Sequence, residues 1–152
     1  MLYLSLGSNR GDRRALLDQA VRLIGERVGS VDAVSDYVET EPWGFVSTHL
    51  FLNAALRVRT LLTPWQVLEQ TQLIERELGR TAKSADGRYH DRPIDIDLLE
   101  YDDVCMDEWR EVLGRMQRLT LPHPLMRQRD FVMIPLSQVV LAGEMPCNDF
   151  HN

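Results

Sequence analysis

The sequence lacks the features of membrane-spanning, disulfide-linked and zinc-binding proteins. Its apolar runs are all shorter than the roughly 18 residues that a membrane helix requires. It has only two cysteines, Cys105 and Cys147, which form no C-x-x-C pair, and its four histidines show no spacing typical of metal ligands. We therefore expect no membrane span, no disulfide framework and no zinc site.

Basic residues are also scarce, with 17 Lys and Arg against 23 Asp and Glu and a net charge of -6. Because affinity for a phosphate backbone requires a basic surface, this balance argues against general nucleic-acid binding. The first residues, Met1 to Ser5, lack the basic region and small-residue cleavage site of a secretion signal. They predict a first strand instead, and we expect a cytoplasmic protein.

The composition is that of a globular domain. Hydrophobic residues make up 44% of the chain and charged residues 26%, which is ordinary for a soluble protein. A chain of 152 residues is long enough to bury about two-thirds of its unfolded surface around one core. We expect a single domain over residues 1–152, acting as a monomer.

Hydrophobic periodicity and breaker residues predict an α+β fold. The expected order β, α, β, β, α, β is typical of a ferredoxin-like sandwich, in which helices pack on an antiparallel sheet. Residues 109–119 are left open between a short helix and irregular chain. The expected elements are strands over 2–6, 31–39, 50–61 and 94–99, helices that begin after Asp12 and Thr63 and end at Gly29 and Gly79, and a helical stretch over 126–140 interrupted by Pro135.

The stretch from Arg92 to Leu99 alternates apolar and acidic residues. In a strand, Asp95 and Asp97 share one face, while isoleucine and leucine side chains share the other. The two carboxylates lie about 7 Å apart along such a strand, close enough to hold one or two divalent cations such as Mg²⁺. The alternative is a half-buried strand whose acidic residues are simply solvated.

A cluster of cations lies just before this acidic strand. Local basicity in an acidic chain indicates a bound polyanion. The surrounding residues 80–92 have no helical or alternating pattern, which predicts a long loop, and we expect residues 81–91 to act as a lid. The cluster consists of Arg80, Lys83, Arg88 and Arg92, with Tyr89 among them.

Five separated blocks carry the more specific motifs. They are Leu6 to Asp12; Thr40 to Gly44 with Phe51 to Ala55; Thr71 to Glu75 with Gly79-Arg80; Arg88-x-x-x-Arg92-x-x-Asp95-Ile96-Asp97-Leu98-Leu99; and Leu119 to Pro124 with Arg129 to Val132. In this order the blocks resemble those of the 6-hydroxymethyl-7,8-dihydropterin pyrophosphokinases. The resemblance extends from about residue 2 to residue 136, and a chance match of five ordered blocks is improbable.

The resemblance implies a reaction of the folate pathway. A pyrophosphoryl group passes from ATP to the hydroxymethyl group of the pterin, and AMP is released. Positioning and charge neutralisation would then carry the catalysis, with no nucleophilic residue. The implied partners are the two small-molecule substrates and two Mg²⁺ ions, with no nucleic acid and no membrane.

The resemblance also implies a role for each matching residue. Asp95 and Asp97 would hold the metal, and Arg80, Arg88 and Arg92 would be catalytic. The residues implied for ATP are Gln72, Glu75, Arg88, Arg92, Leu98, Arg118, Thr120, His123 and Arg129. Those implied for the pterin are Thr40, Pro42, Trp43, Phe51, Asn53, Tyr89 and Phe131.

Other interpretations stay open at this point. A ferredoxin-like regulatory module would bind a nucleotide without turning it over, and a metal-dependent phosphohydrolase would release phosphate from ATP without an acceptor. Individually, an arginine is often a solvated surface charge, and Gln72 and Glu75 would suit an exposed helix face. The turn from Gly7 to Asp12 lacks the Lys and Ser/Thr of a phosphate-binding Walker loop and is interpreted as structural.

Overall fold

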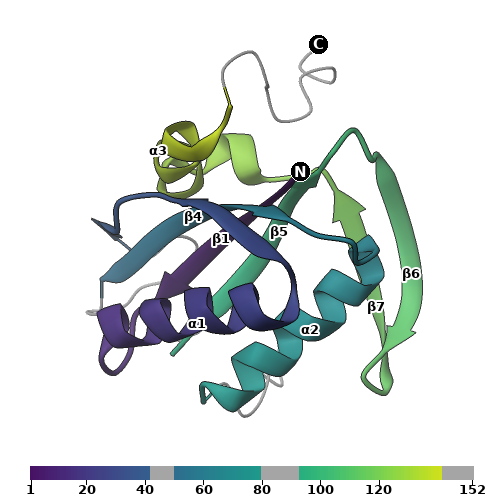
Figure 1. The fold of residues 1–152 in the computed structure, drawn as a ribbon, viewed down its shortest axis with the longest axis horizontal. Helices are drawn as coiled ribbons and strands as arrows, with labels where there is room; N and C mark the ends of the chain where they lie inside the picture. The colour runs from purple at the N-terminus through teal and green to yellow at the C-terminus, as the bar shows by residue number, and fades with distance from the viewer. Residues whose placement is uncertain (42–49, 80–92, 142–152) are drawn as a thin grey trace.

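The computed structural model describes residues 1–41, 50–79 and 93–141. Strands and helices alternate in the expected order along this part of the chain (Figure 1). None of its helices is long and apolar enough to cross a membrane. The elements are β1 (Leu2–Ser8), α1 (Arg13–Arg27), β2 (Ser30–Val34), β3 (Val38–Thr40), β4 (Phe51–Arg59), α2 (Pro64–Glu77), β5 (Asp95–Tyr101), β6 (Met106–Val112), β7 (Arg115–Leu121), the 3₁₀ turn Met126–Gln128 and α3 (Asp130–Val139).

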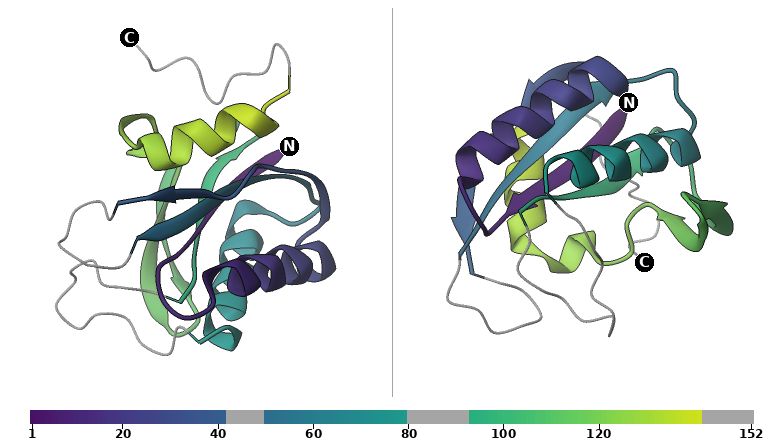
Figure 2. Two further views of the ribbon diagram at one scale, coloured as in Figure 1. Left: turned by 90° about the vertical axis from the view of Figure 1, so that its left-hand side faces the viewer. Right: turned by 90° about the horizontal axis from the view of Figure 1, so that it is seen from below.

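The main sheet is antiparallel, with strands in the order β2-β4-β1-β5 and β3 paired to β4. Helices α1 and α2 cover one face of this sheet and α3 covers the other (Figure 2). Alternate residues of β1 serve the two cores: Leu4 is buried beneath α1 and α2, whereas Tyr3 is buried beneath α3. The predicted α+β sandwich with an antiparallel sheet is confirmed.

Both main helices begin at the predicted caps. Asp12 Oδ1 accepts a hydrogen bond from the backbone N–H of Ala15 at 3.1 Å. At α2, Thr63 and Gln66 form a capping box: the Gln66 N–H donates to Thr63 Oγ1 at 3.2 Å, and the Thr63 N–H donates to Gln66 Oε1 at 2.8 Å. Two otherwise unpaired backbone donors are thereby satisfied, which fixes where α2 starts.

The predicted single strand over residues 31–39 is wrong, because the chain divides into β2 and β3 at Ser35. Ser35 is buried, and its hydroxyl accepts the N–H of Ala55 at 2.8 Å and donates to the carbonyl of Asp36 at 2.8 Å. A side chain that bonds the backbone in this way replaces a regular pairing of the ladder. Pairing with β4 resumes at Val38, opposite Asn53.

Residues 109–119, which the sequence left open between helix and irregular chain, lie in a β-hairpin formed by β6 and β7. Its turn places Leu113 at φ 51° and Gly114 at φ 84°. Two successive positive φ values are typical of the tight turns that join antiparallel strands, although a leucine at the first of these positions is unusual.

The last helical stretch also differs from the prediction. Residues 126–128 form a 3₁₀ turn, and α3 begins at Asp130 and continues through Pro135 to Val139. The interruption therefore lies at Arg129 rather than at Pro135. Pro135 stands in the second turn of α3, where it is buried with Val132 and Leu136.

We expect Gly29→Ala to destabilise the fold strongly. A Cβ at Gly29 would lie 2.0 Å from the carbonyl oxygen of Arg59, so one of the two backbone segments must move. We expect a loss of about 1–3 kcal/mol in the free energy of unfolding, measured by urea denaturation.

Gly25→Ala serves as the control. Gly25 is exposed within α1, and its Cβ would meet only Val31 Cγ2 at an ordinary 3.8 Å. Replacing a mid-helix glycine by alanine should raise stability by about 0.5–1 kcal/mol. Equal urea midpoints for the two variants would contradict the predicted clash.

Candidate active site

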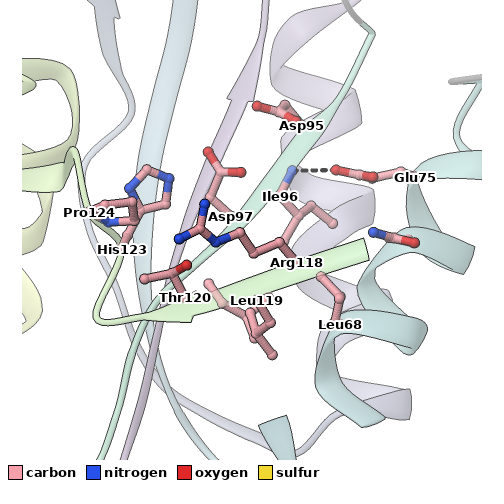
Figure 3. Close-up of a pocket in the computed structure, with 12 residues that line it drawn as sticks. Leu68, Glu75, Asp95, Ile96, Asp97, Arg118, Leu119, Thr120, His123 and Pro124 are labelled. Carbon is pink, nitrogen blue, oxygen red and sulfur yellow. Dashed lines mark hydrogen bonds between the residues drawn. The ribbon is translucent and has the colours of Figure 1, made fainter. Parts of the chain in front are cut away.

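A cavity of about 340 Å³ lies between α2, β5 and β7 (Figure 3). Three of its walls come from parts of the chain that are well separated in sequence. The segment that follows β7 completes it. Eight of the residues predicted for ATP or metal line this cavity: Gln72, Glu75, Asp95, Asp97, Leu98, Arg118, Thr120 and His123.

The two aspartates lie on the face of β5 that the alternating pattern predicts. Ile96 and Leu98 point into the core beneath α1 and α2 and are each 5% exposed. Asp95 and Asp97 are half-buried and face the other way, with Asp95 opposite Gly7 of β1 and Asp97 opposite Ser5. Both carboxylates border the cavity, so the interpretation of Asp95 and Asp97 as merely solvated acids is disfavoured.

Glu75 of α2 fixes the strand between the two aspartates. Its side chain is 5% exposed, and its Oε2 accepts the backbone N–H of Ile96 at 2.6 Å (Figure 3). This N–H belongs to the outer edge of β5, since β1 pairs with the other edge. The alternative of an exposed helix face is therefore wrong for Glu75.

Arg118 and Thr120 of β7 are held by a residue that the sequence did not single out. Asp107 of β6 accepts hydrogen bonds from Arg118 Nε at 2.6 Å, from Arg118 Nη2 at 2.7 Å and from the Thr120 hydroxyl at 3.0 Å. The hydrogen bonds from Arg118, and next from Thr120, lower the pKa of Asp107 to about 2. Only the strand register brings these three side chains together, so no local motif announces Asp107.

Gln72 joins α2 to the hairpin. Its Nε2 donates to Gln117 Oε1 at 2.6 Å, and Gln117 Nε2 donates back to Gln72 Oε1 at 2.9 Å. Gln117 also donates to the carbonyl of Val112 at 3.0 Å. This reciprocal amide pair fixes one wall of the cavity against another, and the sequence gave no signal for Gln117.

His123 lies at the end of the cavity as a neutral imidazole. Burial, followed by the positive charge of Arg129, lowers the pKa of His123 to about 4, while Asp95 opposes the shift. The backbone N–H of Leu125 donates to Nδ1 at 3.1 Å, so the proton of the neutral ring belongs on Nε2. His123 therefore offers one N–H donor.

A second group of predicted residues lies on the α3 side of the sheet. Asn53 of β4 stands opposite Gly7 of β1, which stands opposite Asp95 of β5. Asn53 Nδ2 donates to Thr40 Oγ1 at 2.6 Å. A Cβ at Gly7 would lie 3.1 Å from Asn53 Oδ1 and 3.5 Å from Phe51 Cδ1. The missing side chain of Gly7 keeps the face between Asn53 and Asp95 open, a role that the structural interpretation of this turn overlooked.

Arg129 and Phe131 border the same side of the sheet at the start of α3. Phe131 packs against the smaller core that contains Tyr3. Arg129 is 5% exposed, and its Cζ lies 5.6 Å from the centre of the Phe131 ring, which is within the range of a cation–π contact. A buried guanidinium thus lies near both His123 and an aromatic residue predicted for the pterin.

Comparisons with known proteins identify the family. The sequence model described as "7,8-dihydro-6-hydroxymethylpterin-pyrophosphokinase (HPPK)" matches residues 3–141. The chain belongs to this pyrophosphokinase family. The resemblance inferred from the sequence blocks is confirmed.

Two relatives illustrate the match. A protein of Porphyromonas gingivalis named "2-amino-4-hydroxy-6-hydroxymethyldihydropteridine pyrophosphokinase" is 52% identical over 141 residues, which cover 91% of this chain and 90% of the relative. A protein of the same name from Bacillus subtilis is 40% identical over 138 residues, covering 90% of this chain and 76% of the relative.

A solved structure supports the fold. It is titled "Crystal Structure Analysis of the HPPK-DHPS in complex with substrates" and matches with a TM-score of 0.71 at 14% identity. The match covers 90% of this chain and 39% of the solved chain. At this identity the similarity concerns the fold alone.

Several residues predicted from the pyrophosphokinase pattern lie outside the described residues. Their roles, and that of the lid over residues 81–91, stay predictions. These residues are Pro42, Trp43, Arg80, Arg88, Tyr89 and Arg92.

The donor set of the cavity fits a hard divalent cation. Within residues 1–41, 50–79 and 93–141, no group of three or more His, Cys, Asp and Glu side chains forms a complete metal cage. Asp95 and Asp97 supply two carboxylates at the cavity. Mg²⁺ is commonly bound in this way by pyrophosphoryl- and phosphoryl-transfer enzymes, through one or two carboxylates together with substrate phosphates.

We expect NMR titration to show a strongly depressed pKa for His123, near 4 in the free protein, because burial and Arg129 disfavour the imidazolium. Adding Mg²⁺ and a non-hydrolysable ATP analogue should raise it, since phosphate charge favours the protonated ring. The His123→Gln variant identifies the signal. An ordinary pKa in the free protein would show that His123 is more solvated than its position implies.

Proposed function

We propose that ATP binds in the cavity between α2, β5 and β7, and that the pterin binds on the α3 side of the sheet near Asn53. The chain has the activity of its family: it transfers the pyrophosphoryl group of ATP to 6-hydroxymethyl-7,8-dihydropterin in folate biosynthesis and releases AMP. The observation that carries the assignment of sites is the convergence in one cavity of predicted residues from α2, β5, β7 and the segment after it.

The row formed by Asn53, Gly7 and Asp95 supports direct transfer between the two sites. The hydroxymethyl oxygen of the pterin must reach the β-phosphorus of ATP, and catalysis consists mainly of holding the two groups in line. Asn53 offers an amide to a heterocycle edge, while Asp95 stands by the triphosphate. Because Gly7 has no side chain, nothing at this position separates them.

Asp95 and Asp97 would hold Mg²⁺, and we propose two ions. When bound, Mg²⁺ neutralises charge on the triphosphate and orients its oxygens. The strand itself contributes the fixed separation of the two carboxylates, and Glu75 holds that strand in place through the N–H of Ile96.

Cationic and neutral donors complete the proposed phosphate site. Arg118 and Arg129 supply guanidinium groups, which stay charged and match phosphate oxygens in pairs. His123 supplies the Nε2–H donor. Arg80, Arg88 and Arg92 are proposed as the catalytic arginines from their positions in the family pattern.

For the adenosine moiety we propose Gln72, Glu75, Leu98 and Thr120, all of which line the cavity. The pterin would contact Thr40, Phe51, Asn53 and Phe131, with Pro42, Trp43 and Tyr89 added from the pattern. We further propose that the protein acts as a single-domain monomer in the cytoplasm, which sedimentation and cell fractionation would test.

Incubation with ATP, Mg²⁺ and the hydroxymethyl-dihydropterin should yield AMP only when all three are present. Asp97→Ala should lower turnover by several orders of magnitude with little change in circular dichroism, because it removes a metal ligand from a half-buried site. Asp103→Ala, at an exposed position beyond β5, is the control. ADP or free phosphate as the main product would indicate a different phosphotransferase or a phosphohydrolase.

We expect Asn53→Ala to weaken pterin binding by about 1–3 kcal/mol, because the buried heterocycle edge would lose its partner. The affinity for an ATP analogue should change far less, since Asn53 lies outside the residues that line the cavity. Isothermal titration calorimetry measures both. Equal losses for the two ligands would instead assign Asn53 to the scaffold.

A further inference from the structure

We propose that Asp107 is a positioning residue for ATP, which acts by holding the Arg118 guanidinium and the Thr120 hydroxyl in the orientation that the nucleotide meets. This inference rests on the proposed function, because it requires ATP to occupy the cavity that Arg118 and Thr120 line. It adds a residue from β6, a strand that contributes no residue to the cavity lining itself.

The hairpin register places the participants on one face. Asp107 is directly opposite Thr120, and Trp109 is directly opposite Arg118. Opposed residues of an antiparallel pair point to the same side, so all four side chains share one surface of the hairpin. Arg118 therefore lies between the Asp107 carboxylate, which it contacts at 2.6 and 2.7 Å, and the Trp109 ring, whose centre is 6.0 Å from its Cζ.

The carboxylate selects which part of the guanidinium faces outward. Arg118 uses Nε and one hydrogen of Nη2 for Asp107, and a guanidinium has five N–H donors in a fixed fork. Three donors stay available, and their direction is set by the pair. A flexible arginine would otherwise have to be ordered by the ligand, at the expense of binding free energy.

Asp107 also sets the polarity of Thr120. The hydroxyl donates its only hydrogen to Asp107 Oδ1 at 3.0 Å, which leaves oxygen lone pairs as what Thr120 can offer to the cavity. The ligand group that meets Thr120 must then be a donor, such as an amino or hydroxyl group of the nucleoside. Without the carboxylate the hydroxyl would be free to rotate.

A structural explanation for Asp107 is weaker. The Asp107 and Arg118 side chains are 50% and 55% exposed, and exposed ion pairs contribute little to the stability of a fold. The hairpin is attached to the rest of the chain elsewhere, through the Gln72–Gln117 pair and the buried Leu119 and Leu121. Loss of the carboxylate should consequently affect the ligand more than the fold.

The test is Asp107→Asn, which keeps the size of the side chain but removes its charge and one acceptor. We expect KM for ATP and Kd for a non-hydrolysable ATP analogue to rise about tenfold, the size expected for a lost charged hydrogen bond. The kcat at saturating ATP, KM for the pterin and the urea midpoint should each change by less than about twofold.

Two further variants separate positioning from general effects. Asp32→Asn is the matched control, because Asp32 accepts a hydrogen bond from Arg59 Nε at 2.7 Å in another exposed pair, remote from the cavity lining. It should leave both nucleotide constants unchanged. In an Arg118→Met background, Asp107→Asn should have only a small additional effect, because the two residues act through one contact.

Nucleotide constants within about twofold of wild type, or a lowered urea midpoint with parallel losses for both substrates, would overturn the proposal. So would full additivity with Arg118→Met. If the wild-type protein binds the analogue but forms no AMP, the proposed function fails while the Kd comparison still decides the role of Asp107. If it binds no analogue, both fail.

Discussion

The hydrogen bond between the Glu75 carboxylate and the backbone N–H of Ile96 is the contact on which the candidate site depends. A carboxylate that is 5% exposed is costly unless it is paired, and the outer edge of a sheet offers unpaired N–H donors. The contact satisfies both requirements at once. It fixes α2 beside β5, and the alternation of β5 then directs Asp95 and Asp97 to the cavity instead of the core.

The hairpin depends on a different kind of contact. It forms its own two-stranded sheet, so the ladder of the main sheet does not position it. Side-chain amides and charged groups take over that task, since Gln72 and Gln117 join it to α2 while Asp107 orders the residues that face the ligand. The nucleotide wall is thus built from polar contacts, whereas the opposite wall rests on backbone pairing.

Sequence reasoning succeeded where a signal is local. The alternating acids of β5, the capping box of α2 and the ordered family blocks all lie within short stretches, and each predicted a feature that the structure or the comparisons confirm. The metal site at Asp95 and Asp97 and the roles of individual residues stay predictions, although most of those described gather in one cavity.

The failures have physical reasons that also concern particular residues. A leucine at positive φ concealed the hairpin turn at Leu113, and the buried hydroxyl of Ser35 divided one expected strand into two. Asp107 and Gln117 matter only through strand register and helix packing, which no short pattern encodes. Gly7 was underestimated because its contribution is the space left by an absent side chain, visible only once Asn53 and Phe51 are placed around it.

The Gln72–Gln117 pair has a consequence for folding. Its members are 45 residues apart in sequence, and Glu75 and Ile96 are 21 apart, so the cavity exists only after α2, β5 and the hairpin have all docked. Such non-local contacts form late, because loop closure must precede them. A compact intermediate with intact helices but loose packing would have near-native helical content and no nucleotide cavity. Nucleotide binding therefore reports completed tertiary structure, which circular dichroism in the far ultraviolet does not.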